Sequence, residues 1–281
     1  MKKILFILLF IGFHMGHGQS LTVRQVMDKI LADMGTTIEA GSVDTLKSGT
    51  WDMNVTGIGT TFMTTLDVIK RAKAQGINLI FTHEPTYFNH LDHTNQYGQN
   101  DPVMAAKLQY IHDNGIVIFR FHDLPHQIAD DMINEGMVRQ LGWKDHLIGT
   151  MVFRSPYATV GELAGFLAGH FQTTTVRVVG DASQPVNKIG VLPGAYGPQT
   201  QIDSYNNPDI DVLIIGEARE WETIPYVWDA QELGTRRALI VMGHADSEEG
   251  GMKYVAEWLS GRFTGIPVQF IKAGNPLWSP E

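Results

Sequence analysis

Residues 76–85 read Gly-Ile-Asn-Leu-Ile-Phe-Thr-His-Glu-Pro, and this stretch decides the fold. The apolar run 77–82 is bounded by a glycine before it and a polar turn after it. Continuous apolar runs of this length are typical of strands that are buried on both faces. Pro85 cannot donate to a strand ladder, so the strand ends where His83 and Glu84 stand.

The same pattern recurs along the chain. Further strands are predicted at 54–62, 116–121, 174–179, 189–192, 211–215, 237–242 and 268–271. Helices are predicted from 23, from 65 to 75, from 102 to 114, from about 127 to 141, from 160 to 170, from 220 to 232 and from 247 to 259. The residues expected to cap the N-termini of these helices are Thr22, Thr64 or Thr65, Asp101, Thr159 and Ser247. Buried strands that alternate with helices indicate an α/β fold with sheets covered on both faces.

The predicted organisation has three parts. Residues 1–18 are expected to be a signal peptide, 19–148 an N-terminal α/β lobe and 149–281 a C-terminal α/β lobe. The boundary is placed where a helix gives way to a polar, turn-prone connection near Gly149. We expect two related lobes with mixed sheets, and a functional site between them at the carboxyl ends of the strands.

The N-terminus has the order of a secretory signal. Lys2 and Lys3 precede an apolar run at 4–13, and Gly16 and Gly18 offer a cleavage site before Gln19. The run is too short to span a bilayer as a helix. We therefore expect an exported protein, periplasmic or secreted, with no membrane segment after cleavage. The alternative is a buried N-terminal helix.

Composition excludes several kinds of site. The 281 residues are 43% hydrophobic and carry a formal charge of −9, which disfavours a nucleic-acid-binding surface. Removal of residues 1–18 takes away two lysines and leaves a charge of −11. The absence of cysteine removes disulfides, thiolate ligands and cysteine nucleophiles. A metal in this protein must be held by nitrogen and oxygen, and there are eleven histidines.

Four predicted strands end in histidine or carboxylate. These strand-end residues are His83 and Glu84, then His122 and His126, then Glu217, then His244 and Glu248. Open α/β sheets gather ligands at this edge, and imidazole with carboxylate suits divalent transition metals. The set therefore predicts a metal site.

Each member also has a plainer interpretation. Glu248 can be a first-turn acid facing a helix dipole, and Glu217 can cap the helix that follows it. His244 can be a hydrogen-bonded turn residue, and His126 an ordinary helix-entry residue. The other histidines of the mature chain are expected at the surface: His90, His93, His112, His146 and His170.

Four motifs resemble the Nif-three-like family, also known as dinuclear-metal-centre hexameric proteins and as GTP cyclohydrolase 1 type 2. They are Thr82-His83-Glu84-Pro85 for Thr-His-His-Pro, His122-Asp123-Leu124-Pro125-His126 for His-Thr-x-x-Asp, Ile215-Gly216-Glu217 for Thr-Gly-Glu, and Gly243-His244-Ala245-Asp246-Ser247-Glu248 for Gly-His-x-x-Thr-Glu. The resemblance covers nearly all of the mature chain, and the last motif is the most specific.

The resemblance implies two divalent transition-metal ions (Zn, Mn or Fe) on five ligands: His83, Glu84, His126, His244 and Glu248. Two of these depart from the family pattern, since glutamate replaces histidine at 84 and histidine replaces aspartate at 126. The inventory of three imidazoles and two carboxylates is unchanged, which favours a rearranged centre over a lost one. His122 is then a reserve ligand or supports a ligand.

The implied function is a metal-dependent hydrolase, similar to GTP cyclohydrolase 1 type 2, acting on a small phosphorylated or heterocyclic molecule. Glu217 is the candidate proton carrier or substrate contact. Two divalent ions against two ligand carboxylates predict a locally positive site that attracts anions. The resemblance also implies a homo-oligomer, a hexamer. The alternative is a non-catalytic oligomeric metal-binding or interaction protein with the same fold.

Overall fold

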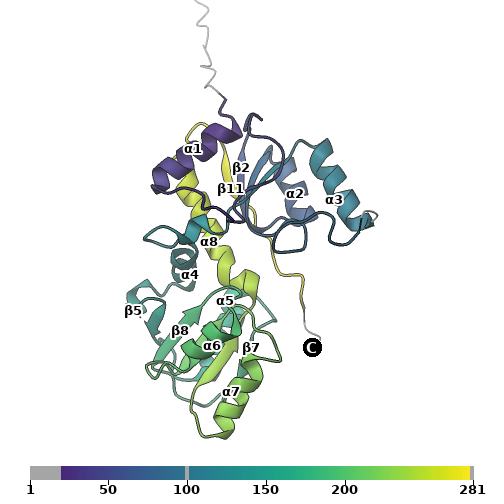
Figure 1. Cartoon of the computed structure of the whole chain (residues 1–281). Helices are drawn as coiled ribbons and strands as arrows, with labels where there is room; N and C mark the ends of the chain where they lie inside the picture. The colour runs from purple at the N-terminus through teal and green to yellow at the C-terminus, as the bar shows by residue number, and fades with distance from the viewer. Residues whose placement is uncertain (1–19, 99–100, 279–281) are drawn as a thin grey trace, which may run out of the picture.

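The computed structural model describes residues 20–98 and 101–278, so the predicted signal peptide lies outside the described residues. Figure 1 shows two α/β lobes joined at a narrow waist. The first lobe holds a five-stranded sheet in the order β1-β4-β3-β2-β11. Its strands are β1 (Leu46–Ser48), β2 (Ile58–Met63), β3 (Leu79–Glu84), β4 (Val117–Arg120) and β11 (Val268–Phe270). All neighbouring pairs are parallel except β1 with β4.

Successive side chains of β3 point to opposite faces of the first sheet, and helices cover both faces. Leu79 and Phe81 pack with α1 (Val23–Met34) and with the apolar face of α8 (His244–Ser260). Ile80 packs on the opposite side with α2 (Leu66–Ala74) and α3 (Pro102–Asp113). Both faces of the sheet are therefore buried under helices, as the continuous apolar run predicts.

The second lobe repeats this plan with a six-stranded sheet in the order β5-β6-β8-β9-β10-β7. Its strands are β5 (Leu147–Gly149), β6 (Val152–Arg154), β7 (Arg177–Val179), β8 (Lys188–Leu192), β9 (Val212–Ile215) and β10 (Ala238–Val241). Strand β9 is parallel to β8 and to β10, and the other neighbouring pairs of this sheet are antiparallel. Helix α5 (Val160–Phe171) covers one face, and α6 (Pro198–Tyr205) and α7 (Thr223–Glu232) cover the other. The predicted fold of mixed sheets covered by helices is confirmed.

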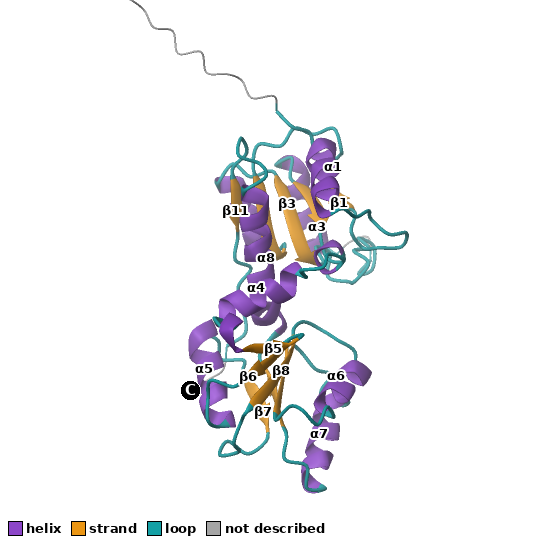
Figure 2. Cartoon of the chain, turned by 90° about the vertical axis from the view of Figure 1, so that its left-hand side faces the viewer, coloured by secondary structure: helices purple, strands orange, loops and turns teal. Residues whose placement is uncertain are grey.

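The waist consists of two crossing helices, α4 (Met132–Leu141) and α8, which Figure 2 shows between the lobes. Their backbones approach closely at Gly136, where an added Cβ would lie 2.3 Å from the carbonyl oxygen of Gly250. Glycine at this crossing is what allows the lobes to meet.

The expected C-terminal lobe, 149–281, is not one unit in space. Met252, Val255 and Leu259 of α8 lie in the core of the first lobe, and β11 pairs with β2. The end of the chain thus returns to the first sheet, because the apolar face of α8 and the short β11 complete that sheet's cover and edge. The second lobe ends with β10 instead.

The cap residues Thr22, Thr65, Asp101 and Thr159 each accept a hydrogen bond from a first-turn backbone N–H, as predicted. Three predicted helix starts are wrong, and one of them is the helix expected from 220, which begins at Thr223. The helix expected from about 127 begins at Met132, capped by Asp131, after a 3-10 turn at Leu124–His126. The helix expected from Ser247 begins at His244, because Gly243 with φ of 113° turns the chain there. A second 3-10 turn spans Lys144–His146.

Across the described residues, no helix is both long and apolar enough to cross a membrane.

Candidate metal centre

The strand-end residues predicted from the sequence meet in one place, in a cavity of about 850 Å³ between the lobes. His83 and Glu84 end β3, while His122 and His126 follow β4. From the other side, His244 and Glu248 come from the first turns of α8, and Glu217 follows β9. Parallel pairing of β2, β3 and β4 brings their carboxyl ends to the same edge, which explains why residues far apart in sequence converge.

Three overlapping groups of side chains offer metal ligands, each with its ligand atoms within 4.8 Å of one another. The groups are His83 with His126 and Glu248, His83 with Glu84 and His122, and Glu84 with His244 and Glu248. All five ligands implied by the resemblance are included, and His122 joins them. Glu84 and Glu248 each belong to two groups, the arrangement that carboxylates bridging two ions need.

His83 gives the most direct test of whether these residues suit a metal. Its ring is fully buried, and Nδ1 lies 3.3 Å from the carbonyl oxygen of Phe121. Nε2 is buried with no hydrogen-bond partner, although Oε2 of Glu248 lies 3.4 Å away. A ring that donates from Nδ1 carries its lone pair on Nε2, the form that ligates metals. A buried lone pair beside a carboxylate calls for a cation, so the donor set fits a divalent metal.

Glu84 lies at the centre of the cluster, where cationic and imidazole groups surround its carboxylate. Its Oε1 is 3.6 Å from Nε2 of His122 and 3.6 Å from Nε2 of His244. Burial by itself would raise the pKa of Glu84, but the interaction with His122 and neighbouring positive charges outweigh it and lower the pKa to about 2. Glu84 is therefore ionised and available as a ligand at neutral pH.

Arg120, which sequence reasoning missed, holds this edge of the sheet in place. It is fully buried, and its Nη2 lies 3.5 Å from Oε2 of Glu84. Its Nε donates to the carbonyl oxygen of His83 (2.8 Å), and Nη1 donates to that of His90 (2.9 Å). The only sequence signal was an arginine inside an otherwise apolar strand.

His244 is hydrogen-bonded on both ring nitrogens. Nε2 lies 2.9 Å from Oε2 of Glu248, and Nδ1 lies 3.2 Å from Oε2 of Glu217. Burial opposes protonation, but these two carboxylates outweigh it and raise the pKa of His244 to about 10. The pKa of Glu248 is lowered, because the histidines around it overcome its burial. Without metal, a proton on His244 thus neutralises part of the negative charge, and an incoming cation would displace it.

Glu217, the predicted catalytic residue, lies in the cavity wall with more than half of its side chain exposed. The hydrogen bond with His244 is the main reason that the pKa of Glu217 is lowered. Its carboxylate orients His244 so that Nε2 faces Glu84 and Glu248, while its exposed side can exchange protons with solvent. Close packing against the backbone of Gly194 explains the glycine before it, since a Cβ at Gly216 would lie 2.5 Å from the carbonyl oxygen of Gly194.

Two aspartates support the histidines that follow β4. Asp131 Oδ2 lies 2.8 Å from Nδ1 of His126, which leaves Nε2 of that ring for a metal. Asp123 makes the same contact with Nδ1 of His122 at 2.8 Å. Asp131 directly precedes α4 and caps it, which is a recognisable sequence signal. Because the helix was predicted to begin at about 127, Asp131 was placed inside it and its role was not identified. His122 is thus equipped as a ligand, beyond the reserve role expected for it.

The histidines expected at the surface differ in their positions. His90 is exposed but also lines the cavity, with its ring centroid 6.2 Å from that of His122. His93, His112, His146 and His170 belong to none of the candidate ligand groups, as expected.

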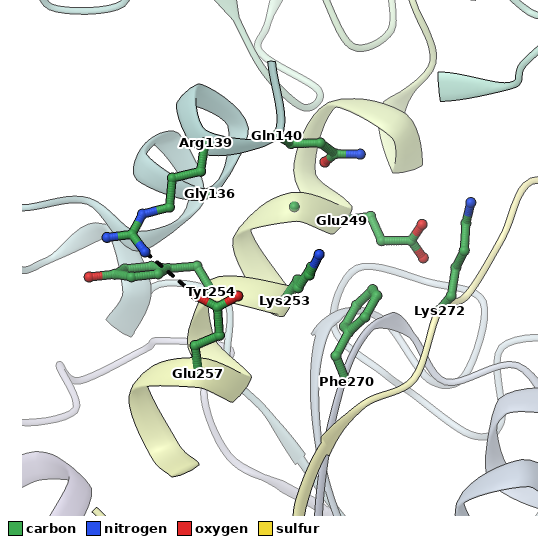
Figure 3. Close-up of a pocket in the computed structure, with 10 residues that line it drawn as sticks. Gly136, Arg139, Gln140, Glu249, Lys253, Tyr254, Glu257, Phe270 and Lys272 are labelled. Carbon is green, nitrogen blue, oxygen red and sulfur yellow. Dashed lines mark ion pairs between the residues drawn. The ribbon is translucent and has the colours of Figure 1, made fainter. Parts of the chain in front are cut away.

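A second cavity, of about 270 Å³, lies against another face of α8, between α4 and β11 (Figure 3). Arg139 there stacks over the ring of Tyr254, 4.2 Å from its centroid, and pairs with Glu257 at 3.5 Å. Glu249 accepts hydrogen bonds from the backbone N–H groups of Ala273 and Gly274. Because none of the candidate ligand groups lies in this second cavity, we assign the chemistry to the cavity between the lobes.

The metal-free protein is expected to be most stable between about pH 4.5 and 6.5. The pKa of His244 is raised from 6.5 to about 10, so its stabilising contribution is complete below pH 6.5 and is lost as pH rises towards 10. The pKa of Glu84 is lowered from 4.5 to about 2, so its contribution is lost as pH falls through that interval. Melting temperatures of chelator-treated protein, measured from pH 3 to 10, follow both the acid and the alkaline loss of stability.

His244→Gln is the control for the alkaline loss of stability, because an amide side chain does not titrate in this pH range. The variant should lose the decline between pH 6.5 and 10. An equal decline in the variant and the parent would show that another group is responsible.

Comparisons with known proteins agree with the fold and the motifs. The sequence model of the Duf34/NIF3 family (NGG1p interacting factor 3) matches residues 34–276. A GTP cyclohydrolase 1 type 2 homolog from Clostridium perfringens (strain 13 / Type A) is 24% identical over 242 residues, which cover 80% of this chain and 86% of that protein.

Two solved structures share the fold at low identity. The Bacillus cereus protein related to NIF3 has a TM-score of 0.71 at 14% identity, covering 94% of this chain and 99% of its own. A Staphylococcus aureus hypothetical protein has a TM-score of 0.71 at 15% identity, covering 93% and 100%.

Proposed function

This chain belongs to the Duf34/NIF3 family, and from that premise and the geometry of its cavity we propose that it is a metal-dependent hydrolase of a small molecule. The observation that carries the proposal is the buried, unpartnered Nε2 of His83, a residue that belongs to two of the three candidate ligand groups. We propose two divalent transition-metal ions (Zn, Mn or Fe) as the cofactor. When bound, such ions supply a Lewis acid that activates water.

The protein's own groups have distinct roles in this proposal. His83, His126 and Glu248 would hold one ion, and Glu84, His244 and Glu248 the other, with His122 beside Glu84. Arg120, Asp123 and Asp131 fix the orientations of these ligands. Glu217 holds the proton of Nδ1 on His244 and would receive the proton released when water attacks the substrate, because it is the exposed carboxylate of the set.

A hydrolysis screen with metal-loaded protein tests this function. We expect turnover of at least one compound among heterocycles, cyclic nucleotides and phosphomonoesters, abolished by chelator and by His244→Ala. Glu217→Gln should lower kcat by about 100-fold or more, the usual contribution of a general base or acid. Glu220→Gln is the matched control, since Glu220 is exposed and pairs with Arg177.

Metal binding without turnover of any compound would support the alternative, a non-catalytic oligomeric metal-binding or interaction protein. That result would leave the assignment of the five metal ligands unchanged and would reject only the catalytic role of Glu217.

We also propose that the protein is exported, to the periplasm or beyond the cell, on the basis of residues 1–18. A reporter fused to residues 1–20 should leave the cytoplasm, and its retention there would contradict the signal. An exported protein would meet little GTP, so GTP itself is not the substrate that we propose.

A homo-oligomer, specifically a hexamer, is the assembly that we propose. Large apolar side chains on and beside α7 support an interface, since Trp221 is 75% exposed, Trp228 62% and Leu233 88%. Light scattering on the purified protein measures the mass directly, and a monomeric mass would contradict the proposal.

A further inference from the structure

Resting on the proposed hydrolase function, we propose that the cavity binds an uncharged planar heterocycle, stacked on Phe88 and Tyr196, and disfavours phosphorylated molecules. The two aromatic residues come from different lobes and line the same cavity as the ligand groups. Phe88 is 48% exposed and Tyr196 is 45% exposed, which is unusual for large rings in a cavity wall. Exposed rings at such a site are surfaces for stacking.

Phe88 is held in position by its surroundings. Its φ of 63° is in the left-handed region, which residues other than glycine seldom adopt outside special sites. The hydroxyl of Tyr97 donates to the carbonyl oxygen of Phe88 at 2.6 Å. Nζ of Lys107 lies 4.7 Å from the centroid of the phenyl ring. These contacts fix the ring before any ligand arrives, and a fixed surface costs less entropy on binding.

Tyr196 belongs to an equally constrained loop between β8 and α6. The backbone N–H of Gly194 donates to Oγ of Ser247 at 2.9 Å, and the carbonyl of Gly194 accepts from the N–H of Glu217 at 3.0 Å. A Cβ at position 194 would lie 2.1 Å from Oε1 of Glu248, so this loop packs directly on a metal-ligand candidate. Within the described residues the Tyr196 hydroxyl has no hydrogen-bond partner, so it is free to bind a polar edge of a heterocycle.

The charge of the cavity argues against a phosphate-bearing ligand. Its wall contains four carboxylates, those of Glu84, Asp131, Glu217 and Glu248, and no lysine or arginine among the described residues. Two divalent ions would bring four positive charges, which these carboxylates cancel. The positive charge expected from two ligand carboxylates counted neither Glu217 nor Asp131, and both line the same wall.

The buried arginine that contacts Glu84 cannot supply the missing charge. Arg120 is fully buried behind Glu84 and donates its N–H groups to the carbonyl oxygens of His83 and His90 and to the carboxylates of Glu84 and Asp92. The side chains that most often recognise phosphate are arginine and lysine, and the described wall of this cavity presents neither.

Binding measurements on metal-loaded protein test the inference. The probes are adenosine, guanosine, cytidine and uridine, each paired with its 5′-monophosphate, together with ribose 5-phosphate, which has no aromatic ring. Equilibrium dialysis should show that at least one nucleoside binds and that its monophosphate binds about tenfold more weakly. Ribose 5-phosphate should not bind.

Variants then locate the stacking surfaces. Phe88→Ala and Tyr196→Ala should each weaken nucleoside binding about tenfold, in keeping with the loss of one stacked base. Tyr196→Phe retains the ring and should stay within about threefold of the parent. The matched control is Trp278→Ala, which removes an exposed aromatic residue that does not line the cavity.

Three results would overturn the inference: no nucleoside binds, a monophosphate binds more tightly than its nucleoside, or both alanine variants bind as the parent does. The proposed hydrolase function fails separately. Nucleosides that bind by stacking but are not turned over, with no other compound hydrolysed, uphold the inference and contradict that function. Hydrolysis of ribose 5-phosphate without binding of any nucleoside would support the hydrolase function and contradict the inference.

Discussion

Glu248→Gln is expected to reduce the metal content from about two divalent ions per chain to one or none. Glu248 contributes to two of the three ligand groups, and its carboxylate lies 2.9 Å from His244 and 3.4 Å from His83. The amide keeps the shape of the side chain but removes the charge that a bridging ligand supplies. Because even supporting residues of metal sites cost 10- to 100-fold in affinity, loss of this ligand should cost more than about 100-fold.

The measurement is elemental emission on zinc-loaded, dialysed protein. Glu249→Gln is the matched control, since it changes the adjacent acid of α8, which accepts backbone hydrogen bonds from Ala273 and Gly274 outside the centre. The control should keep about two ions. Equal metal content in the Glu248 variant and the parent would remove Glu248 from the centre.

Gly136→Ala is expected to have the largest effect on stability. The new Cβ would lie 2.3 Å from the carbonyl oxygen of Gly250 and 2.4 Å from Cα of Gly251. These are backbone atoms of α8 that cannot rotate away, so α4 and α8 must separate at the waist. Overpacking of this kind costs about 3 kcal/mol or more of the free energy of unfolding. A chain of this size should lose roughly 10 °C in Tm.

Gly165→Ala provides the matched control for this prediction. Gly165 is also inside a helix, α5, but nothing lies within 4 Å of its added Cβ. Alanine there should leave stability unchanged or raise it by up to about 1 kcal/mol, because alanine favours helix over glycine. If both variants had the same melting temperature as the parent, the tight crossing of α4 and α8 would be wrong.

Local features of the sequence predicted much of the fold. Apolar runs such as 77–82 mark strands buried on both sides, and Thr22 or Asp101 mark helix starts through hydrogen bonds within one turn. The strand-end residues could be found for the same reason, since each follows its strand directly in the chain. These signals need no knowledge of distant segments.

Long-range contacts account for what the sequence did not show. The return of α8 and β11 to the first sheet depends on packing between residues about 190 positions apart, such as the Thr60 hydroxyl and the carbonyl of Met252. Arg120 could not be placed because its partners include backbone carbonyls of a separate loop. Asp131 enters the cavity only in the folded chain, so its negative charge was not part of the charge expected for the site.

The central claim is that this cavity holds two divalent ions, and anomalous diffraction at the zinc edge from zinc-loaded crystals tests it most directly. We expect two peaks about 3.5–4 Å apart. One should lie among His83, His126 and Glu248, and the other among Glu84, His244 and Glu248. Peaks only at other places on the protein, or no peak at all in zinc-loaded crystals, would contradict the account.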